Sequence, residues 1–141
     1  MKAVRYSDLN SKQKEIYNFQ KVAAMLADYG FNCIKLADDW QGADFLAYHI
    51  DGIQTLRVQL KARATIAKKY EGKNLHMAFP VKSQGAWYLV KHDHLVDLVG
   101  EHTNWLETKS WLSEGLYSST SPNKEMLKAL GKFKLTTIIQ S

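Results

Sequence analysis

The chain has 141 residues, of which 45% are hydrophobic and 23% are charged, values that are ordinary for one globular domain with a real core. No apolar run approaches the roughly eighteen residues of a transmembrane helix. The single cysteine, Cys33, excludes an intrachain disulfide and a cysteine-rich zinc site. Because the amino terminus is polar and lacks a signal-peptide core, we expect an intracellular, cytoplasmic location. The net charge of +5 suits a polyanionic partner.

The first element that the sequence predicts is a helix over residues 11–29. Asn10 is a suitable N-cap, Gln13 completes a capping box three residues later, and Gly30 suits the carboxyl end. A strand is expected over residues 31–36, followed by a polar loop over residues 37–41.

Residues 43–63 alternate between polar and apolar side chains on both sides of Asp51-Gly52, which predicts a β-hairpin. This dipeptide favours a two-residue type I′ turn, in which Ile50 pairs with Ile53. One face of the hairpin is apolar and is expected to face the core. It carries Ala43, Phe45, Ala47, Leu56, Val58 and Leu60.

The polar face of this hairpin brings three chemically useful side chains together. The predicted register places Asp44 opposite Gln59, with Cβ atoms about 4.5–5.5 Å apart. Lys61 lies two residues beyond Gln59 and so points to the same face. A carboxylate, an amide oxygen and an ammonium group would therefore converge, close enough to share a metal ion.

The rest of the chain predicts shorter elements. Residues 64–74 form either a mobile loop or a short helix, and strands are expected over residues 75–81 and 86–90. A short helix follows over residues 92–99. Residues 101–120 are expected to be irregular, with Trp105 and Trp111 as anchors, before a helix that starts at Ser121 as N-cap and Pro122. This order predicts an α/β (α+β) fold with a mixed sheet flanked by helices.

With Asp44 on one strand and Gln59-Leu60-Lys61 on the next, the chain resembles the PD-(D/E)XK nuclease superfamily over about residues 11–90. The resemblance is closest to members with Gln in the middle position. It implies a restriction-endonuclease-like core and Mg²⁺-dependent (or Mn²⁺-dependent) hydrolysis of DNA phosphodiesters, of the restriction, homing or junction-resolving type. Asp44 and Gln59 match the metal ligands, and Lys61 matches the motif lysine.

Two departures from the family pattern are present, and a second acid is a candidate ligand. Ala43 stands where the family has Pro, and Gln59 removes one negative charge, which weakens affinity for a hard cation. Glu15 corresponds to a helix glutamate that faces the site in many members. The simpler reading of Glu15 is a solvated helix carboxylate.

Basic residues near the motif and near the carboxyl terminus are candidates for contacts with DNA phosphates. They are Arg57, Arg63, Lys68, Lys69, Lys73, Lys124 and Lys128. Each can also be interpreted as an ordinary solvated surface residue. Residues 101–141 would be a specificity or oligomerisation extension of the single domain. His92-Asp93-His94 is expected to open a helix rather than to bind a metal.

One active site per chain and two strands to cut predict a homo-oligomer. Two other classes of function stay open. The first is a non-catalytic DNA-binding domain on a degenerate nuclease fold, which Gln59 keeps possible. The second is a protein-interaction domain with no role in nucleic-acid binding.

Overall fold

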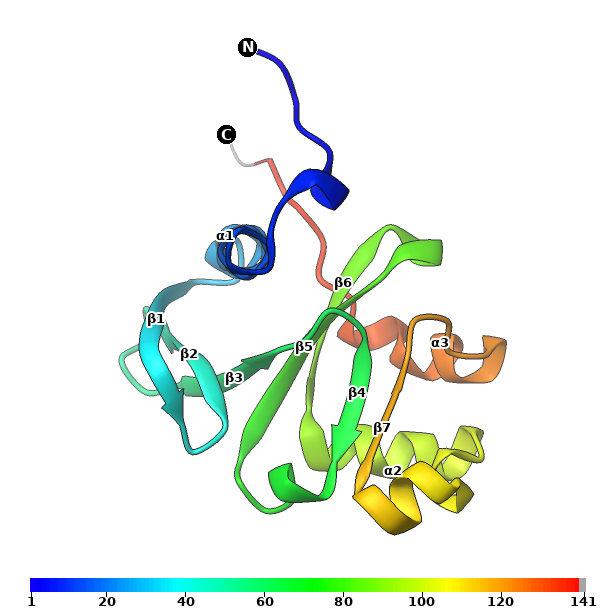
Figure 1. Ribbon diagram of the computed structural model, residues 1–141. Coiled ribbons are helices and arrows are strands. Elements are labelled where there is room, and N and C mark those ends of the chain that lie inside the picture. Colours follow the sequence, from blue (N-terminus) through cyan, green and yellow to red (C-terminus); the bar gives the residue numbers. More distant parts are fainter. Residues whose placement is uncertain (140–141) are drawn as a thin grey trace.

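The fold is built on a five-stranded mixed sheet, and a two-stranded sheet packs beside it (Figure 1). The structure, a computed structural model, describes residues 1–139. Its helices and strands are α1 (Ser11–Ala27), β1 (Phe31–Trp40), β2 (Ala43–His49), β3 (Thr55–Leu60), β4 (Ala64–Ala67), β5 (Leu75–Val81), β6 (Ala86–Lys91), α2 (His92–His102), β7 (Leu116–Ser119) and α3 (Lys124–Leu130). Short 3-10 and π turns fill several of the connections.

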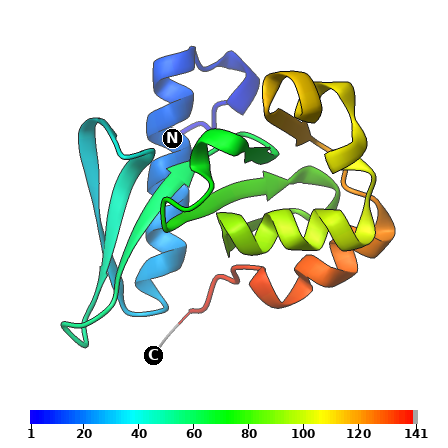
Figure 2. The ribbon, with the colours of Figure 1, turned by 90° about the horizontal axis from the view of Figure 1, so that it is seen from below.

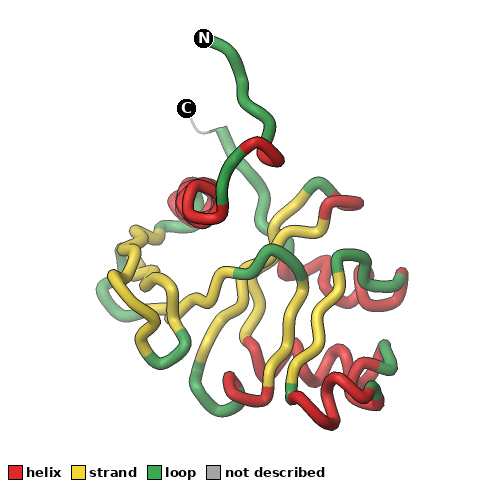
Figure 3. Tube along the Cα trace, in the orientation of Figure 1, coloured by secondary structure: helices red, strands yellow, loops and turns green. Residues whose placement is uncertain are grey.

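The large sheet has the strand order β1-β2-β3-β5-β6. Its neighbouring strands are antiparallel except for β3 and β5, which are parallel. The small sheet is the antiparallel pair β4 and β7, whose strands run side by side in Figure 3. The predicted mixed sheet flanked by helices is therefore confirmed.

Helix α1 begins where the sequence predicts. The Asn10 side chain accepts a hydrogen bond from the Gln13 N–H, and the Gln13 side chain accepts one from the Asn10 N–H, both at 2.9 Å. This capping box satisfies two amide groups that a helix start otherwise leaves unpaired. The helix ends at Ala27, and Gly30, with φ +87°, leads the chain into β1.

The sheet separates two apolar clusters. Helix α1 buries Val22 and Leu26 against β2 and β3, together with the predicted core residues Phe45, Ala47, Leu56, Val58 and Leu60. Helices α2 and α3 and the small sheet cover the other side, which Figure 2 shows from the side of α2 and α3. Ala43 belongs to this second cluster and not to the predicted face, because the start of β2 packs toward Tyr70 and Leu75.

The predicted register of β2 and β3 is confirmed, but their turn is not. The pairs run from Phe45–Val58 to Tyr48–Thr55. Beyond them the predicted Ile50–Ile53 pair is replaced by a four-residue loop over residues 50–53, since the Asp51 carboxylate accepts the N–H groups of Ile53 and Gln54. Two-residue and four-residue loops are both even in length, so the same side chains share a face.

A two-residue turn with positive φ at both positions occurs instead between β1 and β2. Gln41 has φ +53° and Gly42 has φ +86°, with Trp40 paired to Ala43 across them. These values are those of a type I′ turn. The expected polar loop over residues 37–41 is therefore largely strand, with an irregular register between Lys35 and Trp40.

Three further predictions are wrong in detail. Residues 64–67, expected in a loop or helix, are the buried strand β4, and the expected irregular region contains β7. Helix α3 takes Asn123 as its N-cap, not Ser121, because the Asn123 side chain accepts the Met126 N–H at 2.8 Å. Pro122 is buried ahead of that helix.

The segment after α2 packs into the second cluster. Trp105 and Trp111, the predicted anchors, are buried there with Met126 and Leu130 of α3. The final two residues of the predicted 101–141 extension lie outside the described part of the chain. Within residues 1–139, no helix has both the length and the apolar character that crossing a membrane requires.

Candidate active site

A cavity of about 280 Å³ lies between the first turns of α1 and the strands β1, β2 and β3. Three of the predicted site residues line it: Asp44 near the start of β2, Lys61 just after β3, and Glu15 on α1. The rest of its wall consists of Tyr6, Ser11, Lys14, Asn18, Phe19, Lys35, Phe45, Leu60 and Ala62.

Asp44 is fixed by the neighbouring strand. Its Oδ2 accepts the Leu60 N–H at 2.8 Å, at the point where the pairing of β2 with β3 has ended. Burial raises the pKa of the Asp44 carboxyl, and Asp39 raises it further. The Leu60 N–H, Lys61 and Lys35 act in the opposite direction by stabilising the ionised form.

Lys61 is half-buried at the same cavity. Its backbone N–H donates to the Ala78 carbonyl at 2.9 Å, and its Nζ lies 5.8 Å from the centre of the Tyr70 ring. Burial lowers the pKa of the Lys61 ammonium, the nearby Lys69 lowers it further, and Asp44 counteracts both. Burial and a neighbouring cation thus make the protonated form of Lys61 less favourable than that of a free lysine.

Gln59 does not reach the cavity wall. Its side chain is 6% exposed, and its Nε2 donates to the Leu60 carbonyl at 3.4 Å, near the upper limit for a hydrogen bond. Its Oε1 is buried without a hydrogen-bond partner among the described residues. A buried acceptor without a partner costs free energy and calls for an explanation.

Glu15 faces the cavity but is solvated. Its carboxylate forms a 3.6 Å ion pair with Lys12, and 64% of its side chain is exposed. The structure therefore places Glu15 among the residues that line the cavity, as a largely solvated helix carboxylate.

Two cavity residues, Lys35 and Tyr6, were not anticipated from the sequence. Lys35 pairs with Phe45 across β1 and β2, next to Asp44. The Gln41-Gly42 turn would not have revealed it, because the pairing of β1 with β2 shifts register between Lys35 and Trp40. Tyr6 belongs to the segment before α1, where its hydroxyl accepts the Asn18 Nδ2–H at 2.9 Å. No sequence pattern signals that contact.

The residues present fit a divalent cation of the Mg²⁺ type. Asp44 uses one carboxylate oxygen for Leu60, and its Oδ1 has no hydrogen-bond partner among residues 1–139. The Oε1 of Gln59, unpartnered among these residues, is an oxygen donor on the adjoining strand, but Gln59 does not line this cavity. Mg²⁺ commonly takes one or two protein carboxylates and completes its shell with water and phosphate. No group of three or more His, Cys, Asp or Glu side chains is placed to hold a metal within this range.

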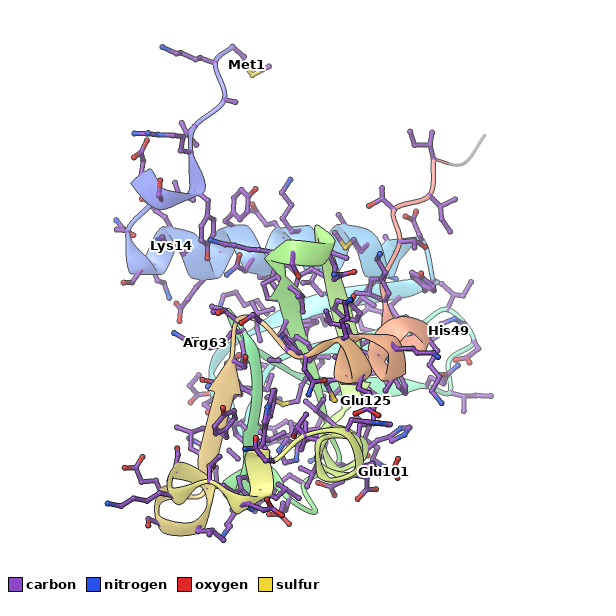
Figure 4. The ribbon with its side chains drawn as sticks, turned by 90° about the vertical axis from the view of Figure 1, so that its right-hand side faces the viewer. Met1, Lys14, His49, Arg63, Glu101 and Glu125 are labelled. Carbon is purple, nitrogen blue, oxygen red and sulfur yellow. The ribbon has the colours of Figure 1, made fainter. Side chains whose placement is uncertain are left out.

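The predicted DNA-contacting residues fall into separate regions. Lys68, Lys69 and Lys73 lie close to Lys61, around two smaller hollows. Figure 4 shows Lys14 of α1 and Arg63 at the same end of the molecule, with His49 at the other end.

The other candidates lie farther from the cavity. The Arg57 guanidinium rests 5.4 Å from the Trp40 ring centre, on strands β3 and β1. Lys124 and Lys128 are exposed on α3, which packs beside α2 on the other side of the sheet from α1.

His92 is a structural residue, as the sequence predicts for the start of a helix. It is 1% exposed, and its Nε2 accepts the Ala67 N–H at 3.1 Å. Its Nδ1 lies 3.0 Å from Asp93 Oδ1, and Asp93 also accepts the Gly72 N–H. These contacts join α2 to β4 and leave no ring nitrogen of His92 free for a metal.

No protein-family model matches the chain, and no curated protein matches it. Two solved structures are similar. One is Archaeoglobus fulgidus Hjc, a Holliday junction resolvase from an archaeal hyperthermophile, with 14% identity and a TM-score of 0.45 over 57% of this chain and 74% of that chain. The other is a bacterial homing endonuclease, I-Ssp6803I, with 15% identity and a TM-score of 0.47 over 82% of this chain and 78% of that chain. Both TM-scores are below 0.5 and both identities are below 25%.

Proposed function

We propose that this protein is a divalent-metal-dependent endodeoxyribonuclease that hydrolyses phosphodiester bonds, with Mg²⁺ or Mn²⁺ as its cofactor. One observation carries the proposal. A half-buried carboxylate, Asp44, and a half-buried amine, Lys61, share one cavity, and the buried amide oxygen of Gln59 on the adjoining strand lacks a partner. Unpaired polar groups of this kind are costly, and sites that need them are functional.

The residues divide the chemistry between them. Asp44 and Gln59 would hold the cation through oxygen atoms, with Glu15 as an outer ligand at the rim. Bound there, Mg²⁺ would polarise a phosphoryl oxygen and lower the pKa of water. Lys61 would either accept a proton from the attacking water or stabilise charge on the phosphate. The water oxygen forms the new bond to phosphorus as the bond to the leaving oxygen breaks.

The partner in this proposal is DNA. Arg57, Arg63, Lys68, Lys69, Lys73, Lys124 and Lys128 are the candidate phosphate contacts, of which the lysines around Lys61 lie nearest the cavity. Cutting both strands of a duplex calls for two sites, so the working form is a homo-oligomer inside the cell. Residues 101–141 are the proposed specificity or oligomerisation element.

A second candidate function is DNA binding without catalysis. It is favoured by the neutral Gln59 and by the lack of three clustered acidic or imidazole ligands in the described chain. In that case the basic surface would bind DNA, while the cavity would have no catalytic role.

A cleavage assay on supercoiled, linear, single-stranded and four-way-junction DNA, with Mg²⁺ or Mn²⁺, separates the two functions. The proposal predicts metal-dependent nicking by the wild-type chain. Asp44→Ala and Lys61→Ala should remove it, whereas Lys132→Ala, which changes an exposed lysine after α3, should not. DNA binding by the wild-type chain without cleavage of any of these substrates would favour the binding domain.

A further inference from the structure

A second hollow, of about 250 Å³, adjoins the candidate active site. Lys61 lines both cavities and therefore marks their boundary. The new hollow lies between the end of β4 with its following turn and the loop that leads into β7. Lys68 and Lys69 line it on the first side, and Glu114 and Gly115 line it on the second.

The three lysines of this hollow are held by aromatic rings. The Nζ atoms of Lys61 and Lys69 lie 5.8 and 5.2 Å from the centre of the Tyr70 ring. The Nζ of Lys68 lies 5.3 Å from the centre of the Trp111 ring. Tyr70 and Trp111 are themselves buried, at 4% and 7% exposure. Cation–π contacts of this kind hold long side chains in place before a ligand arrives, which reduces the entropy that binding loses.

The backbone walls of the hollow are equally well fixed. The Lys68 N–H donates to the Gly115 carbonyl at 2.8 Å, which continues the pairing of β4 with β7. Gly115 has φ +67°, and a Cβ atom there would lie 3.3 Å from the Lys68 side chain. Only glycine therefore combines this backbone conformation with close approach of Lys68.

The lysines of the hollow form no ion pairs with the described part of the chain. Within residues 1–139, no ion pair involves Lys61, Lys68 or Lys69. Glu114 lines the hollow without pairing to any of them. The lining therefore has three lysines and one carboxylate, an excess of positive charge that a bound anion would balance.

We propose that this hollow is an anion subsite that binds one backbone phosphate of DNA, next to the phosphate held at Asp44. The inference rests on the proposed function for the identity of the ligand, and Lys61 would bridge the two positions. The geometry supports a phosphate rather than a carboxylate-bearing protein surface. Three lysine side chains line one concave hollow, and lysine is a common contact of backbone phosphates.

Binding to a short fluorescent duplex in EDTA, measured across a series of NaCl concentrations, tests the subsite without catalysis. The full-length Lys68→Gln/Lys69→Gln variant is compared with Lys82→Gln/Lys132→Gln, which loses the same charge at two exposed lysines that are not among the candidate phosphate contacts. We expect the first variant to bind about tenfold more weakly, as for loss of a charge-assisted contact. Its slope of log Kd against log[NaCl] should fall by about one. The control should keep the wild-type slope.

Two further measurements test the anion subsite independently of that comparison. Glu114→Gln should tighten binding, because it removes the one carboxylate of the hollow. Titration of the wild-type chain with inorganic phosphate should shift the Lys68 and Gly115 amide signals in NMR spectra, and the double variant should lose that response. Equal effects of the two double variants, or no shift with phosphate, would overturn the subsite. Cleavage that persists alongside such a result would leave the proposed function standing.

Discussion

Asp44, in the candidate active site, is less easily ionised in the folded protein than in the unfolded chain. Burial is the largest cause, and it raises the pKa of the Asp44 carboxyl, whereas a metal ligand needs the ionised form. The stability from the folded state's preference for the neutral form is complete below the pKa of the unfolded chain. It is lost as pH rises through the higher native pKa.

The Asp44→Asn variant tests this cost at the residue scale. An amide oxygen can still accept the Leu60 N–H but carries no charge. We expect loss of cleavage by at least about a hundredfold, as for other electrostatic contributors to catalysis, together with a higher melting temperature than wild type at neutral pH. The gain in melting temperature should shrink toward acidic pH, and calorimetry across pH would measure it. A variant that is less stable than wild type at every pH would contradict the account.

Gln59→Glu tests whether the buried amide belongs to the metal site. The carboxylate would lose the hydrogen bond that Nε2 donates to Leu60, and it would add a buried charge. We expect the metal-free variant to lose roughly 3–5 kcal/mol of unfolding free energy, the usual cost of an uncompensated buried charge. Added Mg²⁺ should restore part of that loss.

Urea unfolding with and without Mg²⁺ makes that comparison. Gln84→Glu, in the exposed turn after β5, is the matched control and should respond to neither change. If Mg²⁺ stabilises the Gln59→Glu variant no more than it stabilises wild type, then Gln59 is not a ligand.

Among the elements, the turns that join β1 to β2 and β2 to β3 differ in how much space surrounds their glycines. Gly42 and Gly52 both have positive φ, so alanine strains either position. A Cβ on Gly42 would also lie 2.7 Å from Leu75 Cδ1 and 3.4 Å from the Tyr70 ring, whereas a Cβ on Gly52 would meet nothing within 4 Å.

Gly52→Ala should therefore cost about 1–2 kcal/mol of unfolding free energy, from backbone strain alone. Gly42→Ala should cost about 2–5 kcal/mol, because overpacking of about 1–3 kcal/mol adds to the strain. Chemical unfolding of both variants measures the difference. Equal losses would show that Gly42 is not closely packed against Leu75 and Tyr70.

The link between β4 and α2 gives a second prediction at this scale. His92→Ala would leave the buried Ala67 N–H without an acceptor, at a cost of about 1–3 kcal/mol before any loss of packing. His94→Ala, two residues further along α2 and exposed, should cost less than about 1 kcal/mol. Thermal unfolding compares them, and similar losses would contradict the role assigned to His92.

Local signals were enough to predict several elements. The Asn10 and Gln13 capping box gave the start of α1, and alternation gave β2, β3 and their register. The predicted register is correct although the predicted turn is wrong. The loop that Asp51 stabilises has four residues in place of two, and an even difference leaves the same side chains on each face. Strand β4 was missed because it is four residues long and pairs with β7 about fifty positions away, which no local pattern records.

The candidate site was predictable to the same extent. Asp44 and Lys61 follow from the hairpin, and the structure brings them to one cavity. The burial of Gln59 away from that cavity was not predictable, since the ladder between β2 and β3 stops before it. The position of Lys35 was not predictable either, because the register of β1 against β2 shifts between Lys35 and Trp40, and no local pattern records that shift.

At the scale of the whole molecule, the sheet separates two layers that each supply part of the proposed site. Helix α1, on one side, forms the cavity with Asp44, and the small sheet on the other side forms the hollow with Lys68 and Lys69. Lys61 lines both spaces. Catalysis and backbone binding would thus depend on layers with separate apolar clusters.

Binding of Mn²⁺ tests most directly whether Asp44 lies at a divalent-metal site. At 16.1 kDa the chain suits NMR, and a bound paramagnetic ion broadens the signals of nearby amides. The account predicts that substoichiometric Mn²⁺ broadens the amide signals of Asp44, Leu60 and Lys61 in the wild-type chain, and that Asp44→Asn abolishes the effect. Broadening that is absent, that centres on other acidic residues, or that survives in Asp44→Asn would contradict a metal-dependent site at this cavity.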